Sequence, residues 1–178
     1  MDYTRHVSSP LGGITLASDG EALTGLWFDA QRHFAAALAP AHEERDLPVF
    51  ALTERWLALY FSGVEPDFTP PLRPRGTDFR LAVWALLSRI PRGKTTTYGR
   101  LAAALAAQTG RRVSARAVGG AVGHNPISLL IPCHRVLGAS GALCGYAGGV
   151  ERKRYLLALE GAAPPSALEK TTNGKEVV

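Results

Sequence analysis

Pro66-Asp67-Phe68-Thr69-Pro70-Pro71-Leu72-Arg73-Pro74 is the stretch that divides this chain of 178 residues. Its four prolines disfavour both a continuing helix and an interior strand, because proline fixes φ and has no backbone N–H. Such a composition is typical of a linker, and the sign of the net charge changes across it. We therefore predict one domain over 1–75 and a second over 76–162.

On the N-terminal side of the prolines, short apolar runs alternate with turn signals. Asp19-Gly20 lies between two such runs and indicates a hairpin. The pattern predicts a small three-stranded sheet with a helix, and a polar loop over 40–48. The expected strands are 3–7, 14–17 and 23–28, and the expected helices are a short one over 33–38 and a longer one over 50–61.

On the C-terminal side, helix signals dominate. Thr77 and Ser114 are candidate N-caps, and Pro91 with Gly93 ends the first of these helices. Two short helices joined by a turn indicate a helix-turn-helix. The whole chain is therefore predicted to be α/β (α+β), with a helical second domain. The first expected helix is capped by Thr77, and the others span 98–107, 115–122 and 150–159. A buried strand is expected over 129–131. Residues 163–178 are expected to be a disordered tail.

Charge is distributed unevenly between the two parts. Residues 1–75 carry 6 Lys and Arg against 10 Asp and Glu, whereas residues 76–178 carry 14 against 5. A basic domain beside an acidic one suggests that one of them meets a polyanion such as nucleic acid. A solvated basic surface is the alternative.

The segment 115–122 contains Gly119 and Gly120 in succession, and each glycine costs a helix about 1 kcal/mol relative to alanine. Small residues allow close approach, either to a neighbouring helix or to a nucleic-acid backbone or minor groove. Arg116 lies near the helix N-terminus, where a cation is unfavourable beside the helix dipole. A partner outside the chain would explain that position.

Cys133 stands inside Ile131-Pro132-Cys133-His134-Arg135-Val136. Neighbouring cations lower the pKa of a thiol, and the thiolate is the nucleophile, so this context points to covalent attack by sulfur. The alternative is an inert buried thiol, since free cysteine is among the most buried residue types. Glu160 ends the last predicted helix and is either merely exposed or paired with an imidazole such as His134.

The composition limits which classes of protein this chain can belong to. No apolar run approaches the length of a membrane span, and no secretory signal is visible. Two cysteines give no disulfide framework and fit a reducing compartment. We therefore expect a cytoplasmic protein with no membrane partner.

These motifs together resemble those of the O6-alkylguanine-DNA alkyltransferases. The resemblance is dense over roughly 77–161, whereas the N-terminal part matches only in its general plan of strands and helix. The residues that carry it are Thr97-Tyr98-Gly99, Arg116-Ala117-Val118-Gly119, Gly123-His124-Asn125-Pro126, the Pro-Cys-His-Arg-Val segment at 132–136, Gly145-Tyr146-Ala147-Gly148-Gly149, and Glu160.

The resemblance implies repair of DNA by direct, stoichiometric transfer of an alkyl group from O6-alkylguanine, and possibly from O4-alkylthymine, after the base is flipped out of the stack. It implies a monomer that uses no cofactor and acts once. Cys133 would accept the alkyl group, and His134 would deprotonate it through a water. Glu160 would orient His134, Asn125 would brace the turn, and Tyr98 would protonate the leaving guanine.

The resemblance also implies a minor-groove DNA interface and a base pocket. Arg116 would fill the gap left by the flipped nucleotide. The remaining DNA contacts would be Ser114, Ala117, Gly119, Gly120 and Arg135, and the pocket would be formed by Val122, Val136, Tyr146, Ala147 and Gly148.

Two features depart from the family pattern, and a third concerns a metal site that only some relatives have. Arg111-Arg112 lies in a turn longer than expected, which we interpret as an insertion with an extra phosphate contact. Cys144 stands where a small hydroxyl residue is expected, either as a space-filler or as an oxidation partner of Cys133. Some relatives hold a zinc ion in the N-terminal domain, but residues 1–75 contain no cysteine, so we predict no metal site.

Three other functions compete. A sensor that binds alkylguanine without transfer is the main alternative, although Cys133 argues against it. A cysteine hydrolase would leave the basic domain and Arg116 unexplained. A zinc module built from Cys133, His134, Cys144 and His124 has no paired ligand spacing to support it.

Overall fold

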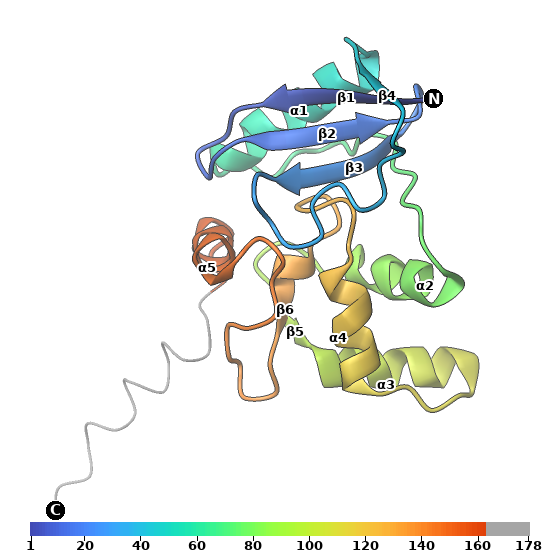
Figure 1. Ribbon diagram of the computed structural model, residues 1–178. Helices are drawn as coiled ribbons and strands as arrows, with labels where there is room; N and C mark the ends of the chain where they lie inside the picture. The colour runs from blue at the N-terminus through green and yellow to red at the C-terminus, as the bar shows by residue number, and fades with distance from the viewer. Residues whose placement is uncertain (163–178) are drawn as a thin grey trace, which may run out of the picture.

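The computed structural model describes residues 1–162, so the tail predicted over 163–178 lies outside the described residues. A sheet with one helix forms the N-terminal part, and a group of helices forms the C-terminal part below it (Figure 1). None of the helices in the described part is both long and apolar enough to span a bilayer. The mixed α/β fold class is confirmed.

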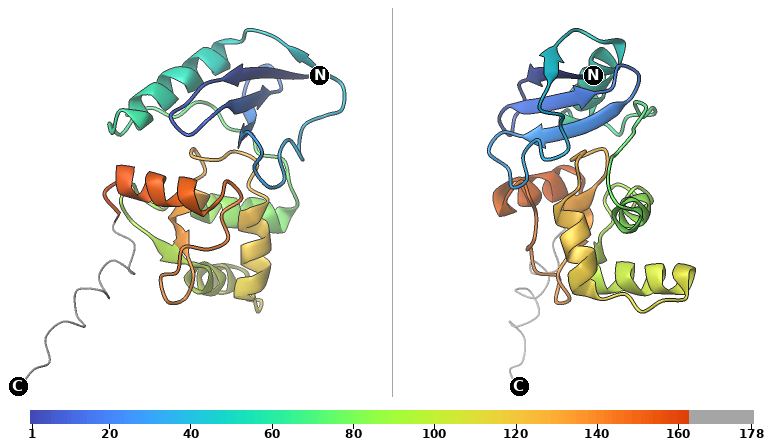
Figure 2. Two further views of the ribbon diagram at one scale, coloured as in Figure 1. Left: turned by 60° about the vertical axis from the view of Figure 1, so that its left-hand side comes forward. Right: turned by 45° about the vertical axis from the view of Figure 1, so that its right-hand side comes forward.

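The N-terminal sheet has four strands, not the predicted three. Strands β1 (Asp2–Val7), β2 (Ile14–Ser18) and β3 (Leu23–Phe28) pair antiparallel, and β4 (His42–Glu44) adds to β1 in parallel, giving the order β3-β2-β1-β4. The prediction of a loop over 40–48 is wrong at β4, whose three exposed polar residues show no strand pattern. Helix α1 (Pro48–Phe61) lies along the sheet (Figure 2) and buries Phe50 and Tyr60.

The short helix predicted over 33–38 is also wrong, because this segment forms successive turns. His33 and Ala35 have φ values of 59° and 52°, in the left-handed region that a right-handed helix excludes. A six-residue helix has little cooperative stability of its own. Tertiary contacts decide the outcome instead, as when Arg32 N–H donates to Ala147 O of the C-terminal part at 3.0 Å.

The four C-terminal helices form as predicted, with ends shifted by up to three residues. Thr77, Thr97 and Ser114 each cap a helix by accepting a backbone N–H. Gly110, with φ 66°, ends the second of these helices and begins the turn of the helix-turn-helix. The helices are α2 (Asp78–Leu87), α3 (Tyr98–Thr109), α4 (Ala115–Gly123) and α5 (Val150–Leu159).

Two details of this part differ from the sequence prediction. The segment 129–131 is buried as expected but is not a strand, and Leu129 has a φ of 69°. Instead, β5 (Thr96–Thr97) pairs in parallel with β6 (Val136–Leu137), and the 3-10 turn η1 (Cys133–Arg135) immediately precedes β6. Two-residue strands leave no periodicity to detect.

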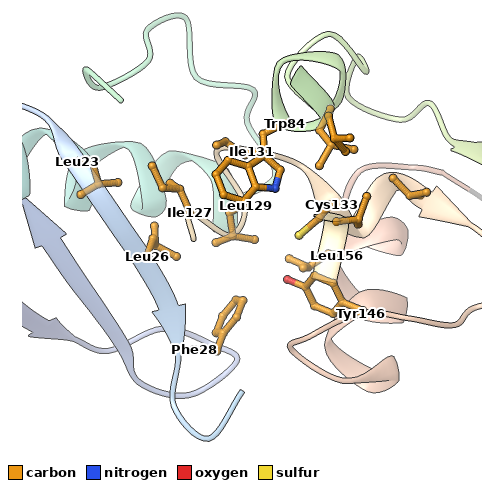
Figure 3. Packing of buried hydrophobic residues seen from close by; sticks show 14 of the residues in the cluster. Leu23, Leu26, Phe28, Trp84, Ile127, Leu129, Ile131, Cys133, Tyr146 and Leu156 are labelled. Atoms are coloured by element: carbon orange, nitrogen blue, oxygen red, sulfur yellow. The ribbon is translucent and has the colours of Figure 1, made fainter. Parts of the chain in front are cut away.

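One hydrophobic core runs across the predicted boundary, from Leu23, Leu26 and Phe28 of β3 to Cys133 and Tyr146 (Figure 3). The outer edge of β3 is paired: Leu26 N–H donates to Pro126 O at 2.8 Å, and Ser128 N–H donates to Leu26 O at 3.0 Å. The N-terminal sheet therefore holds the segment that leads into Cys133.

Candidate active site

Asn125 organises the turn that carries Cys133. Its Nδ2 donates to Ile131 O at 2.7 Å and to Cys133 Sγ at 3.0 Å, while its Oδ1 accepts from Ile127 N–H at 3.1 Å. Asn125 is itself buried. A buried amide that satisfies both ends of a loop fixes the loop in one conformation, so the thiol occupies a defined position.

The Cys133 thiol is buried, with 4% of the residue exposed. Burial raises the pKa of Cys133, and the hydrogen bond from Asn125 and the charge of Lys153 offset only part of this effect. The expectation of an easily formed thiolate is therefore wrong for the closed site. A thiol in such surroundings can act as a nucleophile only where a nearby base can remove its proton.

His134, the next residue, forms a buried pair with Glu160. His134 Nε2 lies 2.7 Å from Glu160 Oε1, and both side chains have no exposed area. Burial lowers the pKa of His134 despite the opposing effect of Glu160, so the imidazole is neutral near pH 7. Since an ionised carboxylate only accepts hydrogen bonds, Nε2 carries the proton and Nδ1 is left basic. Within residues 1–162, Nδ1 has no hydrogen-bond partner.

Arg135 is directed into this cluster, which corrects its prediction as a DNA contact. Its Nε and Nη2 donate to the two oxygens of Glu160 at 2.8 and 2.9 Å, and its Nη1 donates to Ile90 O. Only 12% of the side chain is exposed. Burial opposes ionisation of Glu160, but hydrogen bonds from His134 and Arg135 outweigh burial and hold the pKa of Glu160 well below its usual range.

Tyr146 forms one wall beside the thiol (Figure 3). Its ring lies edge-on to His134, with centroids 6.4 Å apart. Gly148 is buried, and a Cβ there would lie 2.6 Å from the Tyr146 ring, so the close approach of this ring requires glycine. Ala147, the next member of the predicted pocket, is half-buried and accepts from Arg32 N–H.

The other two predicted pocket residues are core residues in this structure. Val136 lies in β6 with no exposed area, and Val122 lies on the buried face of α4. Both belong to the hydrophobic cluster that contains Cys133.

Tyr98 lies at the start of α3, and its hydroxyl donates to Cys144 O at 3.3 Å. Burial, with smaller contributions from the two cysteines, raises the pKa of Tyr98 to about 12, so the phenol keeps its proton at neutral pH. Gly145 has a φ of 72°, and a Cβ there would lie 2.5 Å from the Tyr98 oxygen. The close approach of Tyr98 therefore requires glycine at this position.

Lys153 is a site residue that the sequence interpretation missed. It is fully buried, and its Nζ donates to Val136 O and to Cys144 O. Burial lowers the pKa of Lys153 to about 8. The available signal was a lysine on the apolar side of helix 150–159, one turn before Leu156 and Leu157. Cys144 itself is exposed, which does not fit the space-filler interpretation.

Helix α4 presents its polar and small residues outward. Ser114, Arg116, Ala117 and Gly120 are exposed, whereas Gly119 is half-buried. A Cβ at Gly120 would meet no atom within 4 Å, and one at Gly119 would only touch the Tyr98 ring at 3.8 Å. Packing against a neighbouring helix therefore does not explain the two glycines.

Within residues 1–162, no three His, Cys, Asp or Glu side chains form a group suited to a metal ion. The cluster around Cys133 instead combines a thiol, a neutral imidazole, a buried carboxylate and a phenol. This set can transfer a proton from sulfur to nitrogen and supply another proton to a leaving group.

Two family models match the chain, and they meet at the proline-rich segment. The ribonuclease-like domain of 6-O-methylguanine DNA methyltransferase matches residues 3–74, and its DNA-binding domain matches residues 78–162.

Curated relatives cover almost the whole chain. A methylated-DNA--protein-cysteine methyltransferase of Mycobacterium tuberculosis is 44% identical over 168 residues, which are 94% of this chain and 98% of that protein. The protein of the same name from Haemophilus influenzae is 42% identical and covers 89% of this chain and 86% of its own length.

A solved structure agrees with these relatives. The crystal structure of Mycobacterium tuberculosis OGT in complex with DNA has a TM-score of 0.77 and 43% identity, covering 93% of this chain and 97% of that one. The two family models together span both parts of the chain, and relatives above 40% identity cover nearly its full length. This chain therefore belongs to the 6-O-methylguanine DNA methyltransferase family.

Proposed function

We propose that this protein repairs DNA by moving one alkyl group from O6-alkylguanine to its own Cys133. The observation that carries the proposal is the buried neutral imidazole of His134, bound to Glu160 through Nε2 and basic at Nδ1, directly after a buried cysteine. Within the family just named, this arrangement has a clear use, because a thiol in such surroundings needs a local base before it attacks carbon.

The chemistry balances in one displacement at carbon. A bond forms between Cys133 Sγ and the alkyl carbon while the bond from that carbon to O6 of guanine breaks. The thiol proton passes to His134 Nδ1, through a bridging water, and Glu160 stabilises the imidazolium. Tyr98 gives its proton to the departing guanine, which would otherwise leave as a poor anionic leaving group. The thioether that remains is stable, so each molecule acts once.

Several residues support this step without exchanging protons. Asn125 holds the cysteine turn, as its three short hydrogen bonds indicate. The segment of Tyr146, Ala147 and Gly148 forms the wall against which the base would lie. Because Cys133 and Tyr146 are both buried, we expect this wall to move outward when the base enters.

The exposed side of α4 is the proposed DNA interface. Gly120 is exposed and has open space around it, so a phosphate backbone or groove wall can approach the helix closely. Minor-groove binders commonly insert a side chain into the base stack, and we assign that role to Arg116, which is exposed near the start of α4. Ser114, Ala117 and Gly119 complete the surface, and the excess of positive charge after residue 75 favours it.

The remaining parts of the proposal follow from the same chemistry. No cofactor is needed, because the acceptor is the protein itself. A monomer suffices, since all the residues named lie on one chain. Both cysteines are free, as expected of a cytoplasmic protein.

A sensor that binds the lesion without transfer remains the competing function, and one experiment separates the two. A duplex with labelled O6-methylguanine is incubated with the protein and with Cys133→Ala. We expect label on the wild-type protein only, with equal binding of the duplex by both. Duplex binding by the wild type without any label on it would favour the sensor.

A further inference from the structure

Tyr60 brings a hydroxyl from the N-terminal domain to the His134–Glu160 pair. It lies in the last turn of α1, and its Oη is 2.7 Å from Glu160 Oε1 and 3.5 Å from His134 Nε2. Only 1% of Tyr60 is exposed. Its hydroxyl therefore sits where the base is oriented, although it comes from far away in the sequence.

The direction of this hydrogen bond follows from the charge on Glu160. An ionised carboxylate cannot donate, so the Tyr60 hydroxyl donates to Oε1. The same oxygen accepts from His134 Nε2 at 2.7 Å and from Arg135 Nη2 at 2.9 Å. Three donors thus share one oxygen, and each reduces the charge available to the others.

We propose that Tyr60 is a positioning residue for the alkyl-transfer reaction, which holds Oε1 of Glu160 and limits how strongly that oxygen binds the imidazole of His134. The proposal rests on the function proposed above, because it assigns Tyr60 a role in the same reaction. It also gives the N-terminal domain a part in the chemistry, in addition to its role in packing the cysteine segment.

Tyr60 also has a packing role, which must be separated from this one. Its ring stacks on Trp56, with centroids 5.0 Å apart, and the Arg92 guanidinium lies 5.3 Å from its centroid. Phenylalanine would keep the ring and both contacts. Tyr60→Phe therefore removes the hydroxyl alone.

Other charged and titratable groups also face the cluster, and Tyr60→Phe leaves all of them in place. They come from α5, from η1 and from the loops that precede β5 and α5. These groups are Lys153, Arg135, Cys133, Arg92 and Tyr146.

The decisive measurement is an NMR titration of the His134 imidazole nitrogens in the full chain. Without the Tyr60 hydroxyl, Oε1 binds the imidazolium more strongly, so the pKa of His134 should rise by about 0.5 to 1 pH unit. The acidic limb of the methyl-transfer rate should move to higher pH by the same amount. An unchanged pKa of His134 in Tyr60→Phe would overturn the proposal.

Trp56→Phe is the matched control. It disturbs the aromatic stack without removing a polar group from Glu160, so it should lower the unfolding temperature and leave the pKa of His134 unchanged. If Trp56→Phe shifts that pKa as much as Tyr60→Phe does, packing accounts for the effect and the proposal fails.

Two further measurements separate the role of Tyr60 from the proposed function and from a failure of the variant to fold. If the wild type transfers no methyl group, the proposed function fails, yet the NMR titration still decides the role of Tyr60. If Tyr60→Phe does not fold, titration of the Tyr60 ring in the wild-type protein tests the hydrogen bond to Glu160 instead. Burial and Glu160 raise the pKa of Tyr60 above its ordinary value of 10.0, so the ring of Tyr60 should keep its proton at pH 10. Titration of the Tyr60 ring at or below pH 10 would refute the hydrogen bond.

Discussion

Replacing Glu160 by glutamine tests whether the carboxylate, rather than its shape, makes His134 a base. Glutamine keeps the size of the side chain and one oxygen. The least costly placement leaves that oxygen at Oε1, where it still accepts from His134 and Tyr60, and turns the NH2 group toward Arg135 Nε, which donates to Oε2 at 2.8 Å. The tautomer of His134 is then preserved, but the negative charge is lost.

The structure sets the expected size of two effects. Removing one partner of a buried ion pair typically costs about 3–5 kcal/mol, and Arg135 would be left without its counter-charge. Loss of the charge that stabilises the His134 imidazolium should remove about 3 kcal/mol of transition-state stabilisation, which corresponds to roughly a hundredfold lower rate of methyl transfer.

The assay combines single-turnover transfer from a methylated duplex with urea unfolding. Glu151→Gln is the matched control, because Glu151 lies in the first turn of α5, the helix that Glu160 caps, with 86% of its side chain exposed. The control should change neither quantity appreciably. A Glu160→Gln protein that transfers methyl at the wild-type rate would refute the role given to the His134–Glu160 pair.

Three other predictions concern DNA and pH. Gly120→Ala should stabilise α4 by up to about 1 kcal/mol yet weaken duplex binding, because only an external partner needs the space beside Gly120. Thermal unfolding measures the stability, and a titration with duplex DNA measures the binding. Unchanged binding would contradict the proposed interface. Arg116→Ala should slow repair of duplex DNA far more than reaction with free alkylguanine, and equal losses in the two rate assays would exclude insertion into the stack. Folding lowers the pKa of His134 below 6.5 and that of Glu160 below 4.5, so at acidic pH the unfolded chain binds more protons than the folded one. The free energy of unfolding should therefore fall as pH decreases through 6.5 and then through 4.5. Urea midpoints that rise on acidification would contradict this prediction.

Local signals in the sequence were sufficient for the helices of the C-terminal domain. Threonine and serine caps, and glycine at the turn, act on their immediate neighbours, so Thr97, Gly110 and Ser114 could be interpreted without tertiary information. The same approach failed for residues 33–38, which form successive turns directly after Arg32, whose N–H donates to Ala147 O in the C-terminal part.

The candidate site was predictable where a motif is contiguous and was missed where partners are distant. Cys133, His134 and Asn125 lie within ten residues of one another, and Glu160 follows from the resemblance. Tyr60, in contrast, is 100 residues from Glu160, and nothing in its own helix marks it as more than a core aromatic. The resemblance implied that Arg135 contacts DNA, whereas in the structure its guanidinium binds the buried carboxylate of Glu160, which is 25 residues away in the sequence.

The most direct test of the account is peptide mass spectrometry after incubation with an excess of methylated duplex. The account predicts one methyl group per protein molecule, located on the peptide that contains Cys133, with none on the exposed Cys144. Methyl on Cys144 instead, or repeated removal of methyl from DNA with no label retained by the protein, would contradict it.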